Sequence, residues 1–399
     1  MDYEQFLSPD VQNFIRSIEH EDPGTIVLKK KSIAGFSSVF LAEQVAGRRK
    51  AREKLPQFYK NSGVVFPPPV NLEQSSSEAT AQFKSGFVQR MELKGDRFAD
   101  LTGGFGVDSF FFSSVFKKGE MIEPNPALLE LAEHNHHQLG ATSLTYHNTT
   151  AEKFLKNDGR FDLVYIDPSR RAAGNQKVYS LTQSEPNVVA LQNTIFEKTS
   201  HLLVKTSPLL DIQVALGELK GVKRVVVLSV DNECKELLFF CEKDFAQEPV
   251  IEAVNIAQQK RTDTFEFPYS EERSTISAWS DPLAYLYEPN ASILKAGAFR
   301  LLGTRYALYK LQVNTHLYTS DRLIEDFPGR IFKVVSVVKP DPKFLREFFP
   351  EGKANVMTRN YPMSVAELRK KTKLEDGGER YLIGFSGKDK KFLIAAERV

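Results

Sequence analysis

From residue 96 onward, short apolar runs alternate with stretches of helical spacing, and this alternation limits the possible folds more than any other feature. Strands that alternate with helices form βαβ units around a mostly parallel sheet. The last two runs leave no room for a crossover helix, so we expect them to form an antiparallel hairpin. We therefore predict an α/β domain with strands at Phe98–Thr102, Glu120–Ile122, Leu144–His147, Leu163–Ile166, Leu202–Lys205, Val225–Val230 and Leu237–Cys241.

The regions on either side of this domain differ in character. The first 90 residues predict mainly helices, among them Ser37–Lys54 and a helix that begins with a Ser75–Glu78 capping box. Between them, Val65–Pro69 must be an extended connector, because three prolines cannot lie inside a helix. After Arg261 tyrosine, phenylalanine and proline become frequent, which indicates α+β material. A chain of 399 residues should form two or three domains. We place the boundaries at 1–92, 93–265, 266–327 and 328–399, where the last two segments are small modules of the α+β region.

Several bulk properties indicate a cytoplasmic protein. No apolar run reaches the roughly 18 residues that span a bilayer, so we expect no membrane association. The N-terminus, MDYEQFLSPD, lacks the basic-then-apolar order of a signal peptide. Cys234 and Cys241, the two cysteines, lie in an apolar stretch, and we expect them to be reduced and buried. The sequence leaves the oligomeric state open.

The charge of the chain is small but unevenly distributed. A net charge of +2 and a pI near 8.3 lie below the pI of about 9 that is typical of nucleic-acid-binding domains. Basic residues cluster near the N-terminus, with only Glu43 and Glu53 among them. The cluster is either a solvated helix face or a patch that contacts phosphates. It consists of Lys29, Lys30, Lys31, Arg48, Arg49, Lys50, Arg52 and Lys54.

A glycine-rich segment, Asp100–Ser109, follows the first predicted strand and begins a helix. Gly104 and Gly106 permit a tight turn and let the backbone approach a ligand closely. A nicotinamide fingerprint would have a third glycine in place of Ser109 and no acid before the turn. The carboxylate of Asp100 instead suits the amino group of S-adenosylmethionine.

A second acid strengthens this interpretation. Glu123 ends the next strand, 23 residues after Asp100, where a carboxylate can accept hydrogen bonds from both ribose hydroxyls. The segment Asp100–Ser109, followed by Glu123–Pro126, resembles the class I methyltransferases. It is especially similar to enzymes that methylate the exocyclic amine of a guanine in small-subunit ribosomal RNA. The resemblance covers about residues 72–245.

The resemblance implies further cofactor contacts. Many methyltransferases place an acid against the adenine amino group after the third strand, where this chain has Asn148–Glu152. Thr150 or Asn148 is available there instead. A dinucleotide or a fold without a ligand is disfavoured, because three elements have the order and spacing of an S-adenosylmethionine site. The predicted cofactor contacts are Asp100, Thr102, Gly104, Gly106, Asp108, Glu123, Thr150 and Asp167.

The resemblance also implies a reaction site at the end of the fourth strand, Phe161–Ile166. In amine methyltransferases an Asp or Asn, followed by two prolines and an aromatic residue, holds the target amine. The carboxylate and the proline carbonyl accept its hydrogen bonds. Asp167 and Pro168 match this pattern, whereas Ser169 and Arg170 depart from it. We predict these four residues as the catalytic set.

The departures leave alternatives open. Arg170 could stack on a base or bind a phosphate with its planar guanidinium. Tyr179 could supply the missing ring. In a purely structural interpretation, Asp167 forms a salt bridge with Arg170 or Arg171.

The same motif also resembles the Asp-Pro-Pro-Arg of enzymes that methylate carbon 5 of uridine in RNA. Those enzymes need a nucleophilic cysteine after the fifth strand. Here that strand leads into Lys205–Pro208, and Cys234 and Cys241 fall on later strands. A covalent pyrimidine mechanism is therefore disfavoured. Lys205 is either a pocket residue or a solvated strand end.

Two other features are less specific. His134 and His137 lie on one predicted helix face, but no carboxylate and cysteine set is near them, so we expect no metal. Ser75–Lys84 precedes the first strand, where related RNA methyltransferases place a helix over the cofactor. The residues that either face the cofactor or only pack are Thr80, Phe83 and Lys84.

The C-terminal stretch, with Asp326–Arg330 and Asn355–Pro362, resembles a THUMP-like module of a bacterial methyltransferase family, preceded by a ferredoxin-like module. The THUMP-like resemblance implies RNA as a partner. Tyr361 and nearby basic residues are compatible with stacking and phosphate contact, although such residues also occur on ordinary surfaces. These basic residues are Arg369, Lys370, Lys371 and Lys373.

The sequence therefore predicts a Rossmann-like methyltransferase core, a helical N-terminal region and an α+β C-terminal accessory region, ferredoxin-like plus THUMP-like. We expect S-adenosylmethionine-dependent transfer to a nucleobase amine in structured RNA, through positioning of the reactants. The alternatives are a protein or small-molecule methyltransferase and a non-catalytic RNA-binding factor of the same fold. The intact Asp100, paired glycines and Glu123 disfavour the last of these.

Overall fold

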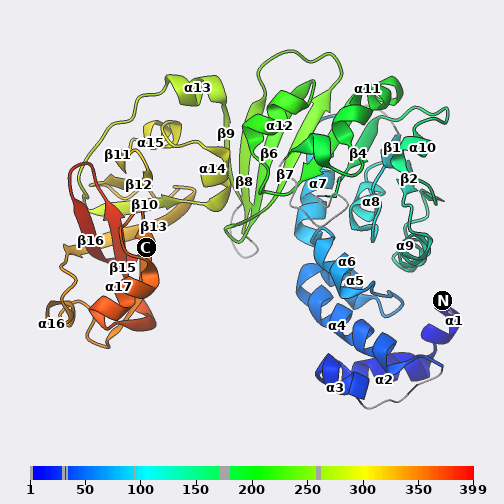
Figure 1. The fold of residues 1–399 in the computed structure, drawn as a ribbon, viewed down its shortest axis with the longest axis horizontal. Coiled ribbons are helices and arrows are strands. Elements are labelled where there is room, and N and C mark those ends of the chain that lie inside the picture. The colour runs from blue at the N-terminus through cyan, green and yellow to red at the C-terminus, as the bar shows by residue number, and fades with distance from the viewer. Residues whose placement is uncertain (1–2, 29–31, 33–34, 94–95, 170–179, 258–261) are drawn as a thin grey trace. The chain divides into compact units, whose positions relative to one another are not determined.

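The computed structural model describes the chain except at residues 1–2, 29–31, 33–34, 94–95, 170–179 and 258–261 (Figure 1). The chain divides into two compact units. The N-terminal unit comprises residues 1–223 and 237–246, and the C-terminal unit comprises residues 224–236 and 247–399. None of the helices within the described ranges is long and apolar enough to cross a membrane.

Up to residue 90 the described residues are mainly helical, as predicted (blue in Figure 1). Helix α4 begins after Ser37, whose Oγ accepts the Phe40 N–H at 3.2 Å, and α7 begins after Ser77, whose Oγ accepts the Thr80 N–H at 3.3 Å. The predicted connector is extended, but α6 already begins at Pro69, because proline suits the first turn of a helix. The helices are α1 (Tyr3–Phe6), α2 (Pro9–Ile18), α3 (Pro23–Leu28), α4 (Ser38–Lys54), α5 (Pro56–Lys60), α6 (Pro69–Gln74) and α7 (Glu78–Arg90).

The predicted parallel sheet follows in the N-terminal unit. Its strand order is β3-β2-β1-β4-β5-β7, with β7 antiparallel to β5 and the other neighbours parallel. The strand order reverses at β1 and β4, and ligands bind at the carboxyl ends of the strands at such a switch point. The strands are β1 (Arg97–Asp100), β2 (Lys118–Ile122), β3 (Leu144–His147), β4 (Leu163–Ile166), β5 (His201–Thr206) and β7 (Glu233–Glu242); the helices are α8 (Val107–Phe112), α9 (Pro126–Gln138), α10 (Ala151–Phe154), α11 (Val188–Lys198), α12 (Ile212–Glu218) and the 3₁₀ helix Leu181–Gln183.

Two amide side chains hold the extended connector in place. The Gln44 side chain of α4 bonds the backbone N–H and C=O of Phe66, each at 2.9 Å. The Asn135 side chain of α9 does the same for Val65 at 2.8 Å. Because both amides satisfy a buried backbone donor and acceptor, they join the N-terminal helices to the α/β domain.

Aromatic packing reinforces this junction. The ring of Phe58 in α5 lies 5.7 Å from that of Phe105 and 5.4 Å from that of Phe110 in α8, measured between centroids. All three are buried in one apolar cluster. The N-terminal helices therefore share a core with the segment that follows β1.

The C-terminal unit begins with β6, which pairs in parallel with β8, while β9 is antiparallel to β8. Between β6 and β7 the chain turns at Asp231 and Asn232, both with positive φ, as two-residue hairpin turns require. A second sheet has the order β11-β12-β10-β13-β16-β15-β14. The elements are β6 (Val222–Val230), β8 (Val250–Ile256), β9 (Asp263–Pro268), α13 (Tyr269–Ser274), β10 (Tyr285–Pro289), α14 (Ala291–Ala296), α15 (Leu301–Arg305), β11 (Tyr309–Gln312), β12 (Thr315–Ser320), β13 (Gly329–Val337), α16 (Pro342–Leu345), β14 (Lys353–Arg359), α17 (Val365–Thr372), β15 (Glu375–Ser386) and β16 (Lys391–Arg398).

This second sheet has a core on each face. In β16, Phe392 and Ile394 belong to one apolar cluster and Leu393 and Ala395 to another, because successive side chains of a strand point to opposite faces. Strand β13 pairs with both β10 and β16. The segments 266–327 and 328–399, which we separate on sequence, therefore contribute to one continuous sheet.

A buried carboxylate links the strands of this sheet. Glu288 of β10 accepts a hydrogen bond from Arg330 Nε at 2.6 Å and another from Arg359 Nε at 2.7 Å. Two guanidinium groups offset the cost of burying one carboxylate. Arg359 lies in the segment Asn355–Pro362, which the sequence associates with RNA, and its charge is directed to Glu288 instead.

Replacing Gly47 by Ala tests the close approach between α4 and the connector. A Cβ at Gly47 would lie 2.4 Å from the Phe66 Cβ, so we expect the unfolding midpoint to fall, by about 1–3 kcal/mol in free energy. This expected loss of stability is opposite to the effect of helix propensity, which favours Ala over Gly by ~1 kcal/mol. Gly86→Ala in α7 is the control, because a Cβ there meets no atom within 4 Å and should raise the midpoint. Scanning calorimetry of the two variants checks this, and a raised midpoint for Gly47→Ala would contradict it.

Candidate cofactor and transfer site

The glycine-rich turn after β1 has the conformation that its sequence predicts. Gly104 has a φ of +55° and Gly106 a φ of +84°, both in the left-handed region that favours glycine. A Cβ at Gly106 would lie 2.6 Å from His136 Nε2. Only glycine therefore fits this position, between β1 and the start of α8.

The histidine cluster of α9 supports this turn. His136 Nε2 lies 2.8 Å from the Gly106 carbonyl oxygen, and His136 Nδ1 lies 3.0 Å from the Tyr146 hydroxyl. Burial lowers the pKa of His136 to about 4, so the ring is neutral at pH 7. His134 instead lies 2.9 Å from the Gly63 carbonyl oxygen. Within the part of the chain that the structure describes, no group of three or more His, Cys, Asp or Glu side chains could hold a metal ion.

Asp100, at the end of β1, is a buried carboxylate next to this turn. It accepts hydrogen bonds from Ser109 Oγ at 2.6 Å and from the Thr102 N–H at 3.0 Å. Burial raises its pKa to about 7, and the charges of Asp108 and Asp167 act in the same direction. A cation placed beside Asp100 would stabilise its ionised form.

Glu123 and Asn148 shape the neighbouring loop after β2. The Glu123 carboxylate accepts the Gly104 N–H at 2.9 Å and the Asn125 N–H at 2.8 Å. The Asn148 side chain donates to the carbonyl oxygens of Glu123 and Pro124, each at 3.0 Å. Asn148 therefore fixes the loop that carries Glu123. Thr150, the other candidate for an adenine contact, is the N-cap residue of α10.

Asp108, predicted as a cofactor contact, is paired with α7. Its Oδ1 lies 3.0 Å from Lys84 Nζ, and its Oδ2 accepts hydrogen bonds from Ser76 Oγ and the Tyr165 hydroxyl, each at 2.7 Å. Lys84 is completely buried and also donates to Ser76 Oγ at 2.9 Å. Burial opposes the ionisation of Asp108, but Lys84, Lys205 and these hydrogen bonds keep its pKa below the usual range. No sequence signal indicates this pairing.

The reaction motif after β4 is tied to the same turn. The Asp167 N–H donates to Thr102 Oγ1 at 2.7 Å. The Asp167 carboxylate forms an ion pair with Lys205 of β5, which is nearly buried. Lys205 is therefore not a solvated strand end. Ser169 forms an antiparallel bridge with Glu185, in which the Ser169 N–H donates to the Glu185 carbonyl oxygen at 2.8 Å.

Three residues of the predicted reaction site lie outside the described residues. They are Arg170, Arg171 and Tyr179. The proposed stacking by Arg170 or Tyr179, and the alternative salt bridges of Asp167, therefore stay predictions.

The two cysteines lie in β7 and are free thiols, Cys241 buried and Cys234 partly buried. Burial raises the pKa of both. Because the thiolate is the nucleophile, neither cysteine is activated. This agrees with the absence of a cysteine after the fifth strand in the sequence.

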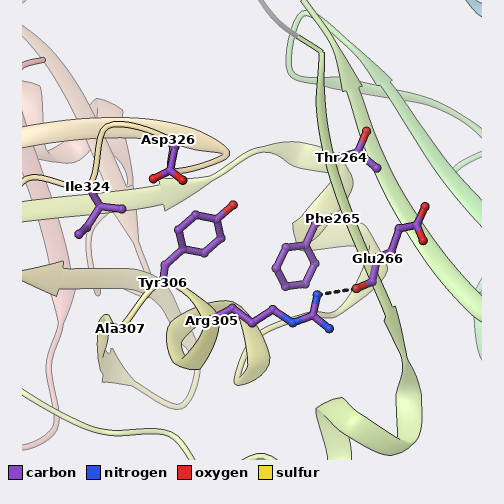
Figure 2. Close-up of a pocket in the computed structure, with 8 residues that line it drawn as sticks. All are labelled: Thr264, Phe265, Glu266, Arg305, Tyr306, Ala307, Ile324 and Asp326. Atoms are coloured by element: carbon purple, nitrogen blue, oxygen red, sulfur yellow. Dashed lines mark hydrogen bonds between the residues drawn. The ribbon is translucent and has the colours of Figure 1, made fainter.

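The C-terminal unit contains a separate hollow of about 520 Å³ (Figure 2). Arg305 covers the ring of Phe265 at 4.8 Å and donates to the Glu266 carbonyl oxygen at 2.6 Å. Tyr306 and Asp326 line the other side. None of the predicted site residues borders this hollow.

Comparison with known proteins agrees with this architecture. Residues 285–328 match a ferredoxin-like domain family, and residues 329–398 match a THUMP domain-like family. The chain is 30% identical to a crystal structure named "putative methyltransferase from Porphyromonas gingivalis W83", with a TM-score of 0.85 over all of this chain and 99% of that one. It is 22% identical over 346 residues to an uncharacterized S-adenosylmethionine-dependent methyltransferase of Mycobacterium tuberculosis strains CDC 1551 and H37Rv, covering 85% of this chain and 90% of that protein.

The parallel sheet, the glycine-rich turn after β1 and the acid after β2 define a class I S-adenosylmethionine-dependent methyltransferase. The full-length similarity at 30% identity goes further. The chain belongs to the family of bacterial S-adenosylmethionine-dependent methyltransferases that carry a ferredoxin-like and a THUMP-like domain at the C-terminus. The predicted fold class, enzyme class and cofactor are thereby confirmed.

Replacing Lys84 by Met tests the ion pair between α7 and α8. The substitution leaves the Asp108 carboxylate buried without its cation, so we expect a loss of about 3–5 kcal/mol in the free energy of unfolding. Adding Asp108→Leu should recover part of this loss, because the uncompensated charge is removed while Ser76 and Tyr165 lose their acceptor. Denaturant unfolding measures both values.

Lys50→Met is the matched control. Lys50 pairs with Glu73 on the surface, so its loss should change stability by less than about 1 kcal/mol. A double variant no more stable than Lys84→Met alone would show that the buried charge is not the cause.

Proposed function

We propose that this enzyme methylates an exocyclic amine of guanine or adenine in structured RNA. The observation that carries the proposal is the position of Asp167 and Pro168 at the carboxyl end of β4, joined to the glycine-rich turn by the bond from the Asp167 N–H to Thr102 Oγ1. Ligands of such sheets bind at this edge. The target amine and the methyl donor would therefore meet at Asp167.

The residues around the turn fit S-adenosylmethionine. Asp100 is a buried carboxylate whose ionised form a neighbouring ammonium group would stabilise. The space beside Gly104 is open, because a Cβ there would meet only one atom within 4 Å, the Thr102 carbonyl oxygen at 3.9 Å. We assign the amino group of the cofactor to Asp100, its ribose to Glu123 and its adenine to Asn148 or Thr150. Thr102, Gly104 and Gly106 would contact it through the turn, and Asp108 would act by fixing the start of α8 against Lys84.

The cofactor, when bound, supplies an electrophilic methyl group on a sulfonium. The Asp167 carboxylate and the Pro168 carbonyl would accept hydrogen bonds from the amine and direct its lone pair at that carbon. The N–C bond forms as the C–S bond breaks, the electron pair remains on sulfur, and the proton then leaves the nitrogen for solvent. No enzyme nucleophile takes part, which agrees with the raised pKa of both cysteine thiols.

RNA capture is assigned to the THUMP-like domain. Residues 329–398 contain sixteen basic and nine acidic residues, although the whole chain is nearly neutral. Such a local excess attracts phosphates. Arg359 and Arg369 form ion pairs with Glu288 and Asp376. The phosphate contacts are therefore assigned to exposed lysines of and after α17, which are Lys370, Lys371 and Lys373.

The N-terminal basic cluster supports RNA binding less than its sequence suggests. Arg48 is buried, donates to Glu19 at 3.0 Å and covers the Tyr59 ring at 4.9 Å. Lys50 pairs with Glu73 at 2.6 Å. These residues stabilise the helical region. Arg48 is therefore part of neither a solvated helix face nor a phosphate-contacting patch, the two alternatives that the sequence leaves open. Lys29, Lys30 and Lys31 lie outside the described residues.

The assignment of Asp100 predicts how cofactor binding depends on pH. Its pKa of about 7 means that below pH 7 an ammonium group must displace a proton from Asp100. The affinity for S-adenosylhomocysteine should therefore fall by up to about tenfold per pH unit below 7 and level off above it. Calorimetry between pH 5.5 and 8 measures this. Asp100→Asn should bind weakly without this pH dependence, whereas Asp96→Asn, an exposed acid paired with Lys117, should behave like the wild type. A constant wild-type affinity over this range would contradict the assignment.

Transfer to RNA is tested with Asp167→Ala. We expect this variant to lose methyl transfer while keeping its affinity for S-adenosylhomocysteine within a few fold, because Asp167 would orient the amine. The assay follows tritiated methyl into RNA from cells lacking the protein, and mass spectrometry of nucleosides identifies the methylated base. Replacing Cys234 and Cys241 together by Ser should leave transfer intact. Cross-linking to 5-fluorouridine RNA, or methyl incorporation into protein alone, would overturn the proposal.

A further inference from the structure

Lys205 is a buried cation that directly contacts the reaction motif. It is the penultimate residue of β5, which runs parallel to β4, and its Nζ forms an ion pair with Asp167 Oδ2. Its side chain is only 9% exposed, whereas that of Asp167 is 32% exposed. An ammonium group is costly to bury and is retained only with a partner. Asp167 supplies that partner and still reaches solvent, from which a substrate would arrive.

Within the described part of the chain, charges near Asp167 come from four other elements. Lys205 of β5 touches it, and Asp100 of β1 is close enough for the Asp167 charge to help raise the Asp100 pKa. Asp108 of α8 lies within the field of Lys205 and pairs with Lys84 of α7. Among the described residues, three carboxylates therefore face two ammonium groups. Direct contact pairs Lys84 with Asp108 and Lys205 with Asp167.

We propose that Lys205 is a positioning residue for methyl transfer, which holds the Asp167 carboxylate ionised and in one orientation so that Asp167 accepts hydrogen bonds from a neutral amine without taking its proton. The assignment rests on the proposed function, in which Asp167 contacts the amine. A carboxylate in contact with a cation has a reduced proton affinity, which makes it a weak base but leaves it an acceptor.

Two consequences follow for the reaction. The amine would keep both hydrogens until the N–C bond has formed, and the proton would then pass to solvent. A cationic target, such as a lysine side chain, would gain little from Asp167, because Lys205 already neutralises it. The pair therefore selects a neutral amine, such as that of a nucleobase.

The test compares Lys205→Met with Lys205→Arg in the full-length enzyme. Lys205→Met should lower kcat for RNA by about tenfold or more. It should also move the acid limb of the rate profile to higher pH by about one unit, because a neighbouring cation typically lowers the pKa of a carboxyl by about 1–3. Lys205→Arg should restore most of both, and S-adenosylhomocysteine affinity should stay within about threefold. Lys223→Met, which removes a surface cation paired with Glu242, should match the wild type.

A second readout does not need the substrate. In protein labelled with ¹³C at the Asp carboxyls, the signal lost in Asp167→Asn identifies Asp167, and its titration midpoint should rise in Lys205→Met and return in Lys205→Arg. If Lys205→Met does not fold, Lys205→Gln gives the same comparison. An unmoved midpoint and acid limb, even with reduced kcat, would overturn the proposal in favour of simple packing. A shifted midpoint in an enzyme that never methylates RNA would refute the proposed function and leave the effect of Lys205 on Asp167 established.

Discussion

The ion pair between Lys84 and Asp108 connects parts of the molecule that the chain order separates. Lys84 belongs to α7, in the helical region before the sheet, and Asp108 is the second residue of α8. The Lys84 ammonium group is completely buried. Separating α7 from α8 would therefore leave a buried charge without its partner, which is costly. Tyr165 of β4 donates to the same carboxylate. The start of α8, and with it the glycine-rich turn, is therefore held by both α7 and β4.

From that point a continuous set of polar contacts reaches the reaction motif. Ser109, next to Asp108, donates to Asp100, which accepts the Thr102 N–H, and Thr102 accepts the Asp167 N–H. Lys205 completes the series at Asp167. The residues assigned to the cofactor and those assigned to the amine thus share one network, and such networks are cooperative. Burial is the main cause of the raised pKa of Asp100, and the charges of Asp108 and Asp167 add to it.

The C-terminal unit uses the same device for a different purpose. Glu288 holds Arg330 and Arg359, so two arginines that look available for phosphates in the sequence stabilise the sheet instead. Arg48 near the N-terminus is a parallel case, paired with Glu19 and stacked on Tyr59. Lysines exposed on and after α17 have no such role among the described residues. Basic composition alone therefore overstates the surface available to RNA, and pairing decides which cations remain for it.

The sequence by itself determined the strands, the turns and the order of the acids at their ends. Asp100, Glu123 and Asp167 each follow a short apolar run, and the signals that end a strand are local, so their common location at one sheet edge could be predicted. Tertiary structure alone decided which charges meet. No periodicity in the local sequence distinguishes Lys84 and Lys205 from ordinary surface lysines. Packing of α7 on α8 and of β5 beside β4 removes their water, and each ammonium group then requires the carboxylate that the fold brings to it.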